Sequence, residues 1–216
     1  MTTSEGRRPG TTAASGTPLA HKRLKALLEL PLLIAAALVI TLVVKAFLAQ
    51  AFFIPSASMH PQLLEGDRVV VSRTAYRLHD VHRGDIVVFP SPAVPAEKEG
   101  IVMRLAHDVL ESVALRDPGD RELIKRVIGL PGDTVEGRDG HVFINGRRLF
   151  EPYLTGDVVT SDFGPTRVPE DHVFVMGDNR TNSHDSRFSD IGPIDIHTIV
   201  GRAIARVWPP TRTAFL

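Results

Sequence analysis

The sequence predicts a mainly β protein in which a single N-terminal transmembrane helix precedes a β-rich domain with one inserted helix. Three observations lead to this prediction. One long apolar segment lies near the N-terminus, and several short β-branched runs bounded by Gly, Pro and Asp follow it. A segment with helical periodicity lies between two of these runs. The 216 residues are enough to bury one substantial core.

Charged residues are unevenly distributed along the chain. The whole chain carries 25 basic and 25 acidic residues, so its net charge is zero. Residues 1–25 contain five basic residues and one acidic residue, whereas residues 46–216 contain 19 basic and 23 acidic residues. The zero net charge argues against a nucleic-acid-binding protein. The lack of cysteine excludes a disulfide scaffold, a thiolate metal site and a cysteine nucleophile.

Residues 27–53 are predicted to form a transmembrane anchor. The segment is apolar apart from Glu29, Lys45 and Gln50, and a helix needs about 20 mostly apolar residues to cross the hydrocarbon core. Residues 1–26 are rich in Gly, Ser, Thr and Pro and are predicted to be disordered. Their basic residues predict a cytoplasmic N-terminus, which leaves residues 54–216 as an extracytoplasmic domain.

Two alternatives exist for the apolar segment. A buried helix of a soluble protein would need a large protein around so uniformly apolar a surface. A cleaved signal peptide would end at Ala49-Gln50-Ala51, which has the small-x-small pattern of a cleavage site. The apolar run is longer than the core of an ordinary signal peptide, so an uncleaved anchor is the favoured interpretation.

Beyond the anchor the chain alternates between β-branched runs and turn residues. Asn145-Gly146 between two apolar runs predicts a tight two-residue hairpin. Residues 90–121 form an insertion, in which apolar residues at helical spacing predict a helix over about 101–115 that packs on the sheet. The segments predicted to contain strands are 66–73, 84–89, 123–135, 141–150, 172–179 and 198–209.

The segment directly after the anchor holds two serines between prolines, PSASMHP at 55–61. The prolines restrict the backbone, so Ser58 is held rather than frayed. A serine needs a base to become a nucleophile. His60 is two residues away, but the sequence marks no acid that would orient it in a Ser-His-Asp triad. Taken alone, the segment is more typical of a linker between an anchor and a domain.

Lys125 is the other candidate base. In a strand, Lys125 and Arg126 face opposite sides, so one of the two cations faces the interior or a cleft. An ammonium group that loses its hydration has a lowered pKa, which makes the neutral amine available. On this segment alone, an edge-strand lysine that reaches solvent is the favoured interpretation. A third polar segment, residues 176–187, predicts either a buried hydrogen-bond network or a solvated loop.

Together these segments resemble the bacterial type I signal peptidases, serine proteases that use a Ser–Lys dyad. The resemblance extends from the anchor to Trp208 and is carried by four motifs in the family's order. It implies the β-fold shared by signal peptidases and repressor-type proteases. It also implies a membrane-anchored endopeptidase that cleaves signal peptides from secreted preproteins after A-x-A-type sites. The motifs are PSASMHPQLLEGD at 55–67, RGDIVVF at 83–89, LIKRVIGLPGDTV at 123–135 and GDNRTNSHDSR at 177–187.

The resemblance implies a role for each matching residue. Ser58 matches the nucleophile and Lys125 the general base. Ser56 matches the serine whose hydroxyl joins the Ser58 N–H in the oxyanion hole, and Ser183 matches the hydroxyl that orients the lysine. Two ion pairs that hold the loop against the site are matched by Asp178 with Arg126 and by Asp185 with Arg187. The residues that match the lining of two shallow apolar pockets for small side chains are Phe52, Ile54, Met59, Leu63, Val69, Val88, Leu123 and Ile124.

The resemblance implies no cofactor and no metal, and the nine histidines show no ligand pattern typical of zinc. The implied partners are signal peptides of secretory preproteins and the lipid bilayer, near the secretion translocon and without nucleic acid. The implied location is the cell membrane, with a single pass. Three residues depart from the family's pattern, and none is a proposed proton-transfer group: Ala57, Gln62 and Thr181.

Two alternative functions are weighed against this one. A self-cleaving Ser–Lys protease of the repressor kind would need a DNA-binding helix-turn-helix where this chain has residues 1–53. A non-catalytic, membrane-tethered β-module would bind partners without forming an acyl-enzyme. The intact set of Ser58, Lys125 and Ser183 argues against the second alternative.

Overall fold

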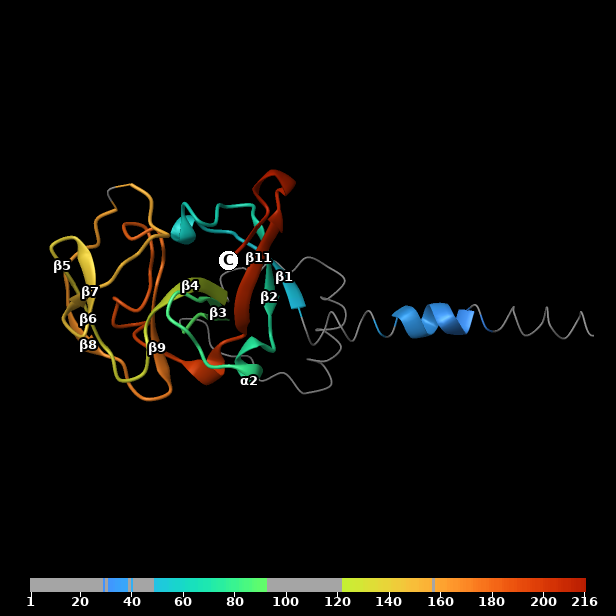
Figure 1. The fold of residues 1–216 in the computed structure, drawn as a ribbon, viewed down its shortest axis with the longest axis horizontal. Coiled ribbons are helices and arrows are strands. Elements are labelled where there is room, and N and C mark those ends of the chain that lie inside the picture. Colours follow the sequence, from blue (N-terminus) through green and yellow to red (C-terminus); the bar gives the residue numbers. More distant parts are fainter. Residues whose placement is uncertain (1–28, 30, 39, 41–48, 93–121, 157) are drawn as a thin grey trace, which may run out of the picture. The chain divides into compact units, whose positions relative to one another are not determined.

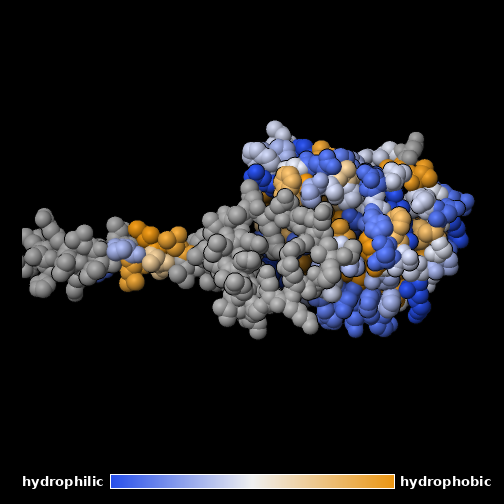
Figure 2. Space-filling view, turned by 180° about the vertical axis from the view of Figure 1, so that it is seen from behind, coloured by the Kyte–Doolittle hydropathy of each residue, from blue (hydrophilic) through white to orange (hydrophobic). Residues whose placement is uncertain are grey.

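The computed structural model describes residues 29, 31–38, 40, 49–92, 122–156 and 158–216 (Figure 1). The chain divides into two compact units, residues 1–41 and 42–216. In the first unit, residues 31–38 are helical, and Figure 2 shows this short segment as mostly hydrophobic. None of the helices in the described ranges is long and apolar enough to cross a membrane. Of the predicted anchor, residues 27–53, positions 27, 28, 30, 39 and 41–48 lie outside the described residues.

The end of the predicted anchor is a strand and not part of a helix. Strand β1 (Ala49–Phe53) pairs antiparallel with β2 (Arg68–Ser72), and Phe52 is buried in the core of the domain. The boundary predicted at residue 53 was therefore wrong. Lipid and a protein core both select apolar side chains, so composition alone did not reveal where one ends and the other begins.

The larger sheet of the second unit has eight strands in the part of the chain that the structure describes. Their order is β1-β2-β11-β3-β4-β9-β10, with β12 paired to β11, and every pairing is antiparallel. Figure 1 shows β3 and β4 between β11 on one side and β9 on the other. The strands not yet given are β3 (Ile86–Pro90), β4 (Glu122–Gly129), β9 (His172–Met176), β10 (Ile194–Asp195), β11 (Gly201–Trp208) and β12 (Ala214–Phe215).

The smaller sheet has four strands in the order β7-β6-β5-β8. The hairpin predicted at Asn145-Gly146 is confirmed, because both residues have positive φ, 51° and 77°, as a tight primed turn requires. Strand β8 was not predicted, because it contains Gly164 and Pro165, which weaken a strand signal. The strands are β5 (Thr134–Arg138), β6 (His141–Ile144), β7 (Arg147–Arg148) and β8 (Phe163–Arg167).

Helices are few among the described residues. Besides residues 31–38, they are one turn of α-helix, α2 (Ala75–Leu78), and the 3-10 helices η1 (Ala57–Met59), η3 (Ile196–Thr198) and η4 (Pro210–Arg212). The described secondary structure is mainly β, as predicted. The predicted helix at 101–115 lies outside the described residues, and Pro90, the first residue of the predicted insertion, belongs to β3.

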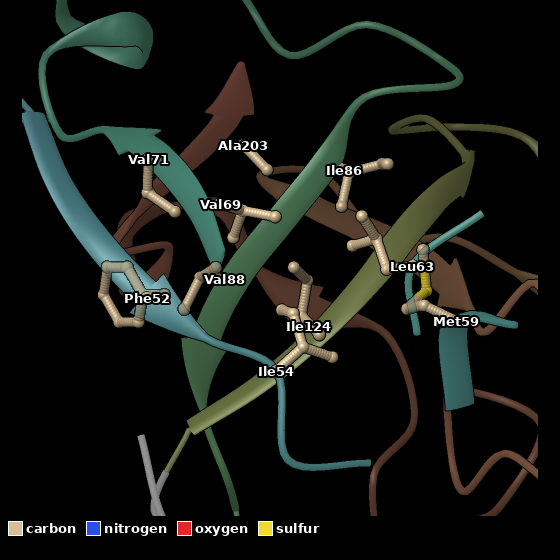
Figure 3. Packing of buried hydrophobic residues seen from close by; sticks show 10 residues of the cluster. All are labelled: Phe52, Ile54, Met59, Leu63, Val69, Val71, Ile86, Val88, Ile124 and Ala203. Atoms are coloured by element: carbon tan, nitrogen blue, oxygen red, sulfur yellow. The ribbon is translucent and has the colours of Figure 1, made fainter. Parts of the chain in front are cut away.

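Three apolar clusters hold the second unit together. One joins β1, β2, β3, β4 and β11, and Figure 3 shows Phe52, Ile54, Met59 and Ile124 within it. A second lies on β3, β4 and β9 and contains Val87. The third fills the space between the two sheets, since it joins residues of β4 and β9 to residues of β5 and β6. Burial of these side chains fixes the ends of β1 and β4 relative to each other.

Candidate active site

Ser58 lies in η1, a single turn that follows β1. Ile54 before the turn and Met59, its last residue, are both buried in the same apolar cluster, so the turn is held at both ends (Figure 3). Asn179 holds the backbone from the other side. Its N–H donates to Ser58 O at 3.0 Å, and its Nδ2 donates to Ala57 O at 3.0 Å. The Ser58 side chain therefore has a fixed position and is only 8% exposed.

Lys125 projects from β4 and meets Ser58. Its Nζ donates to Ser58 Oγ at 2.8 Å and to Ile124 O at 3.1 Å. The two residues are 67 positions apart in the chain. Arg126, the next residue along β4, binds Asp178 instead, so the two adjacent cations have separate partners as the strand alternation predicted.

Burial makes Lys125 a usable base. The residue is 3% exposed, and this loss of hydration lowers the pKa of its amine from the ordinary 10.5 to about 8. The nearby carboxylate of Asp185 acts in the opposite direction, and the guanidinium of Arg187 lowers the pKa further. A substantial neutral fraction is therefore present near pH 8, and a neutral Nζ at this distance can accept the Ser58 hydroxyl proton.

Ser56 and Ser183 both lie close to Ser58. The Ser56 hydroxyl is 3.3 Å from Ser58 Oγ. Ser183 packs on Gly177, where an added Cβ would lie 2.2 Å from Ser183 Oγ and 2.4 Å from Ser58 O. Ser183 Oγ is buried but finds no hydrogen-bond partner among the described residues. The structure thus brings Ser183 to the site without a hydrogen bond to Lys125.

The polar loop, residues 177–187, is held by two ion pairs. Arg126 donates two hydrogen bonds to Asp178, from Nε to Oδ1 at 2.8 Å and from Nη2 to Oδ2 at 2.7 Å. Arg187 donates two hydrogen bonds to Asp185 in the same way, from Nε to Oδ1 at 2.8 Å and from Nη2 to Oδ2 at 2.9 Å. Asp185 also accepts the N–H of Gly177 at 2.9 Å. The loop therefore contains a buried hydrogen-bond network, although Thr181, Asn182 and His184 are exposed. The two pairings expected from the resemblance are present.

A groove lies between the end of β1 and the start of β4, and Ser56 and Lys125 are part of its lining. Sequence reasoning did not single out Phe53, Pro55 or Glu122, which also line it. The remaining predicted lining residues, Met59, Leu63 and Val69, are fully buried in the apolar cluster behind the groove. The predicted residues that do line the groove are Phe52, Ile54, Val88, Leu123 and Ile124.

Both strands beside the groove have an edge without a strand partner in the described part of the chain. Among the described residues, β4 pairs with β3 but not with β9 from Leu123 to Lys125. Within the described ranges, β2 is the only strand that pairs with β1. Such edges present unpaired backbone N–H and C=O groups, which can bind an extended peptide by adding it as a strand.

Among the described residues, neither His60 nor any group of metal-ligating side chains forms a second candidate site. His60 Nε2 is buried and has no hydrogen-bond partner in the described ranges, so no Ser58–His60 contact supports a triad. Within the same ranges, no group of three or more His, Asp or Glu side chains could hold a metal ion. Sequence reasoning missed Asn179, Glu151 and Tyr153, whose contacts reach this site only through the fold.

Comparisons with known proteins give a consistent picture. Residues 27–208 match the family described as signal peptidase, peptidase S26. A probable signal peptidase I-2 from Synechocystis sp. is 37% identical over 190 residues, which cover 88% of this chain and 77% of that protein. The signal peptidase I of Leptolyngbya laminosa is 38% identical, with 83% and 78% covered. A solved signal peptidase I from Enterococcus faecalis V583 is 31% identical, with 57% and 97% covered and a TM-score of 0.40.

Proposed function

The chain belongs to the signal peptidase S26 family and is a serine peptidase that cleaves signal peptides, and from this premise we propose that Ser58 is its nucleophile and Lys125 its general base. The observation that carries the proposal is the 2.8 Å contact between Lys125 Nζ and Ser58 Oγ. Burial of Lys125 supports it, because a pKa of about 8 leaves neutral amine near physiological pH.

The proposed reaction is acyl transfer through Ser58. Neutral Lys125 takes the proton of Ser58 Oγ while Oγ attacks the scissile carbonyl carbon. The resulting ammonium returns this proton to the leaving amine, and the C–N bond breaks to give an acyl-enzyme on Ser58. Lys125 then takes a proton from a water molecule that attacks the ester carbonyl carbon. The bond between this carbon and Ser58 Oγ breaks, Lys125 returns the proton to Oγ, and the signal peptide leaves with a free carboxyl group. No cofactor takes part in these steps.

Ser56 is proposed to complete the oxyanion hole with the Ser58 N–H. We expect Ser56→Ala to lower kcat by about 10²-fold with little change in KM, since one lost oxyanion donor commonly costs that much. Ser56→Thr keeps a hydroxyl and should retain most of the activity. The measurement is steady-state kinetics on a peptide with an A-x-A site. An unchanged kcat in Ser56→Ala would remove Ser56 from this role.

The substrate is proposed to bind as an extended strand between the open edges of β1 and β4. Its first and third side chains before the cut would then enter the groove, whose apolar lining includes Phe52, Val88 and Ile124. Such a groove would accept alanine and exclude larger groups, which gives the A-x-A preference of secretory precursors.

This specificity gives the direct test of the proposed function. We expect purified full-length protein to cut a preprotein after its A-x-A site, as determined by the N-terminal sequence of the product. Replacement of the alanine just before the cut with tryptophan should reduce kcat/KM by at least about 10²-fold, because the side chain cannot enter the groove. Tryptophan at the middle position should be tolerated, and equal loss at both positions would contradict this binding mode.

We further propose that the enzyme works at the cell membrane, close to the translocon, with its N-terminus in the cytoplasm. The charge distribution supports this orientation, since residues 1–25 are net positive. The exposed apolar side chains of Leu32, Leu33 and Ile34 on the short N-terminal helix support contact with lipid. In the second unit, Trp208 and Phe215 are also exposed apolar side chains.

A further inference from the structure

We infer that Glu151 and Tyr153 are positioning residues that hold the two members of the Ser58–Lys125 pair in place; the inference rests on the proposed function of that pair. Both residues lie in the segment between β7 and β8 of the smaller sheet, outside the groove. They contact each other, because Tyr153 OH donates to Glu151 Oε1 at 2.8 Å. Each of them also contacts a different arginine of the site.

Tyr153 acts on the Lys125 side. The guanidinium carbon of Arg126 lies 4.0 Å from the centre of the Tyr153 ring, within the range of a cation–π interaction. Arg126 is therefore fixed between this ring and the carboxylate of Asp178, which it binds at 2.7 and 2.8 Å. Because Arg126 directly follows Lys125 in β4, the contact restrains the strand residue from which the base projects.

Glu151 acts on the Ser58 side. Arg180 donates to it through Nη2 at 2.6 Å and Nη1 at 3.2 Å, and the same guanidinium donates through Nε to Gly177 O at 3.0 Å. Gly177 in turn packs closely against the backbone of Ser58, since an added Cβ there would lie 2.4 Å from Ser58 O. Glu151 thus orients the arginine that fixes the backbone against which Ser58 packs.

The charged groups of this network are buried, so each of them needs its partner. Arg180, Arg126 and Asp178 are all buried, and Glu151 is the carboxylate that balances Arg180. Loss of one partner would leave a buried charge without compensation, and the site would relax around it. The Arg180 N–H also donates to Asp178 O at 3.1 Å, which joins the two sides into one connected network.

The test separates positioning from general stability. Active sites are counted by the burst of nitrophenol released from an Ala-x-Ala p-nitrophenyl ester, and turnover of an A-x-A peptide is expressed per titrated site. We expect Glu151→Gln and Tyr153→Leu each to lower kcat per titrated site about 10-fold with KM nearly unchanged, because small misplacements of reacting groups have effects of this order. Tyr153→Met, which also removes the ring over Arg126, serves if Tyr153→Leu does not fold.

The matched control is Glu136→Gln, which breaks the Glu136–Arg138 ion pair on β5 of the same small sheet. It should turn over like the wild type. Wild-type kcat per titrated site in Glu151→Gln and in the Tyr153 variant, even with a lowered melting temperature, would overturn the inference. Absence of a burst from wild-type protein would instead overturn the proposed function of Ser58, so the two failures are distinguishable.

Discussion

Replacing Ser58 with alanine is expected to abolish signal-peptide cleavage while leaving the fold intact. The reason is the loss of the atom that forms the acyl-enzyme, and removal of a serine nucleophile can lower kcat by roughly 10⁶-fold. The fold should persist because the turn around Ser58 is held by Ile54, Met59 and Asn179 rather than by the hydroxyl. Lys125 Nζ keeps its bond to Ile124 O in the variant.

The measurement is cleavage of an A-x-A preprotein, combined with circular dichroism to verify folding. Ser189→Ala, at an exposed serine outside the groove, is the matched control and should cleave normally. Substantial cleavage by Ser58→Ala would exclude Ser58 as the nucleophile. A non-catalytic β-module, the alternative of a different class, predicts that even the wild-type protein gives no burst with an activated ester.

The sequence predicted well those features that depend on neighbouring residues. Asn145-Gly146 specified its hairpin because the turn type needs positive φ at two consecutive positions. The alternation of Lys125 and Arg126 likewise follows from the geometry of a single strand. These are local constraints, which a short stretch of sequence contains in full.

Features that depend on distant residues were predicted only through the resemblance or not at all. No local pattern brings Lys125 to Ser58, and their pairing was expected because four motifs matched a family in order. Met59, Leu63 and Val69 were expected in the substrate groove, yet they belong to the core behind it, since both environments select apolar side chains. Glu151 and Tyr153 carry no motif signal, because their contacts with Arg180 and Arg126 depend on the packing of one sheet against the other.

The second large effect is expected when the proposed base, Lys125, is replaced. Lys125→Met keeps the length and apolar stem of the side chain but removes the amine, so cleavage should fall to background. Lys125→Arg should be equally inactive, because a guanidinium keeps its charge and cannot accept the Ser58 proton. In the wild-type enzyme, kcat/KM should rise with pH to half its maximum near pH 8 and level off above it, as the pKa of about 8 for Lys125 requires.

Stability provides an independent measurement of the same pKa. Below pH 8, Lys125 is protonated in both the folded and the unfolded state, and its burial destabilises the fold. The difference between a folded pKa of about 8 and an ordinary value of 10.5 corresponds to about 3 kcal/mol of unfolding free energy. Between these two pH values the unfolded state binds the extra proton, so wild-type stability relative to Lys125→Met should rise as pH rises.

We therefore expect Lys125→Met to be inactive at pH 7 but more stable than the wild type. Removal of the buried charge should raise the unfolding free energy by up to about 3 kcal/mol. The lost hydrogen bond to Ser58 should reduce this gain by about 1 kcal/mol. Urea unfolding of both proteins at pH 7 and pH 10 measures the difference, which should shrink at the higher pH. A variant that is less stable at pH 7, or a difference independent of pH, would mean that Lys125 is not a desolvated amine. It would then not be the neutral base that the mechanism needs.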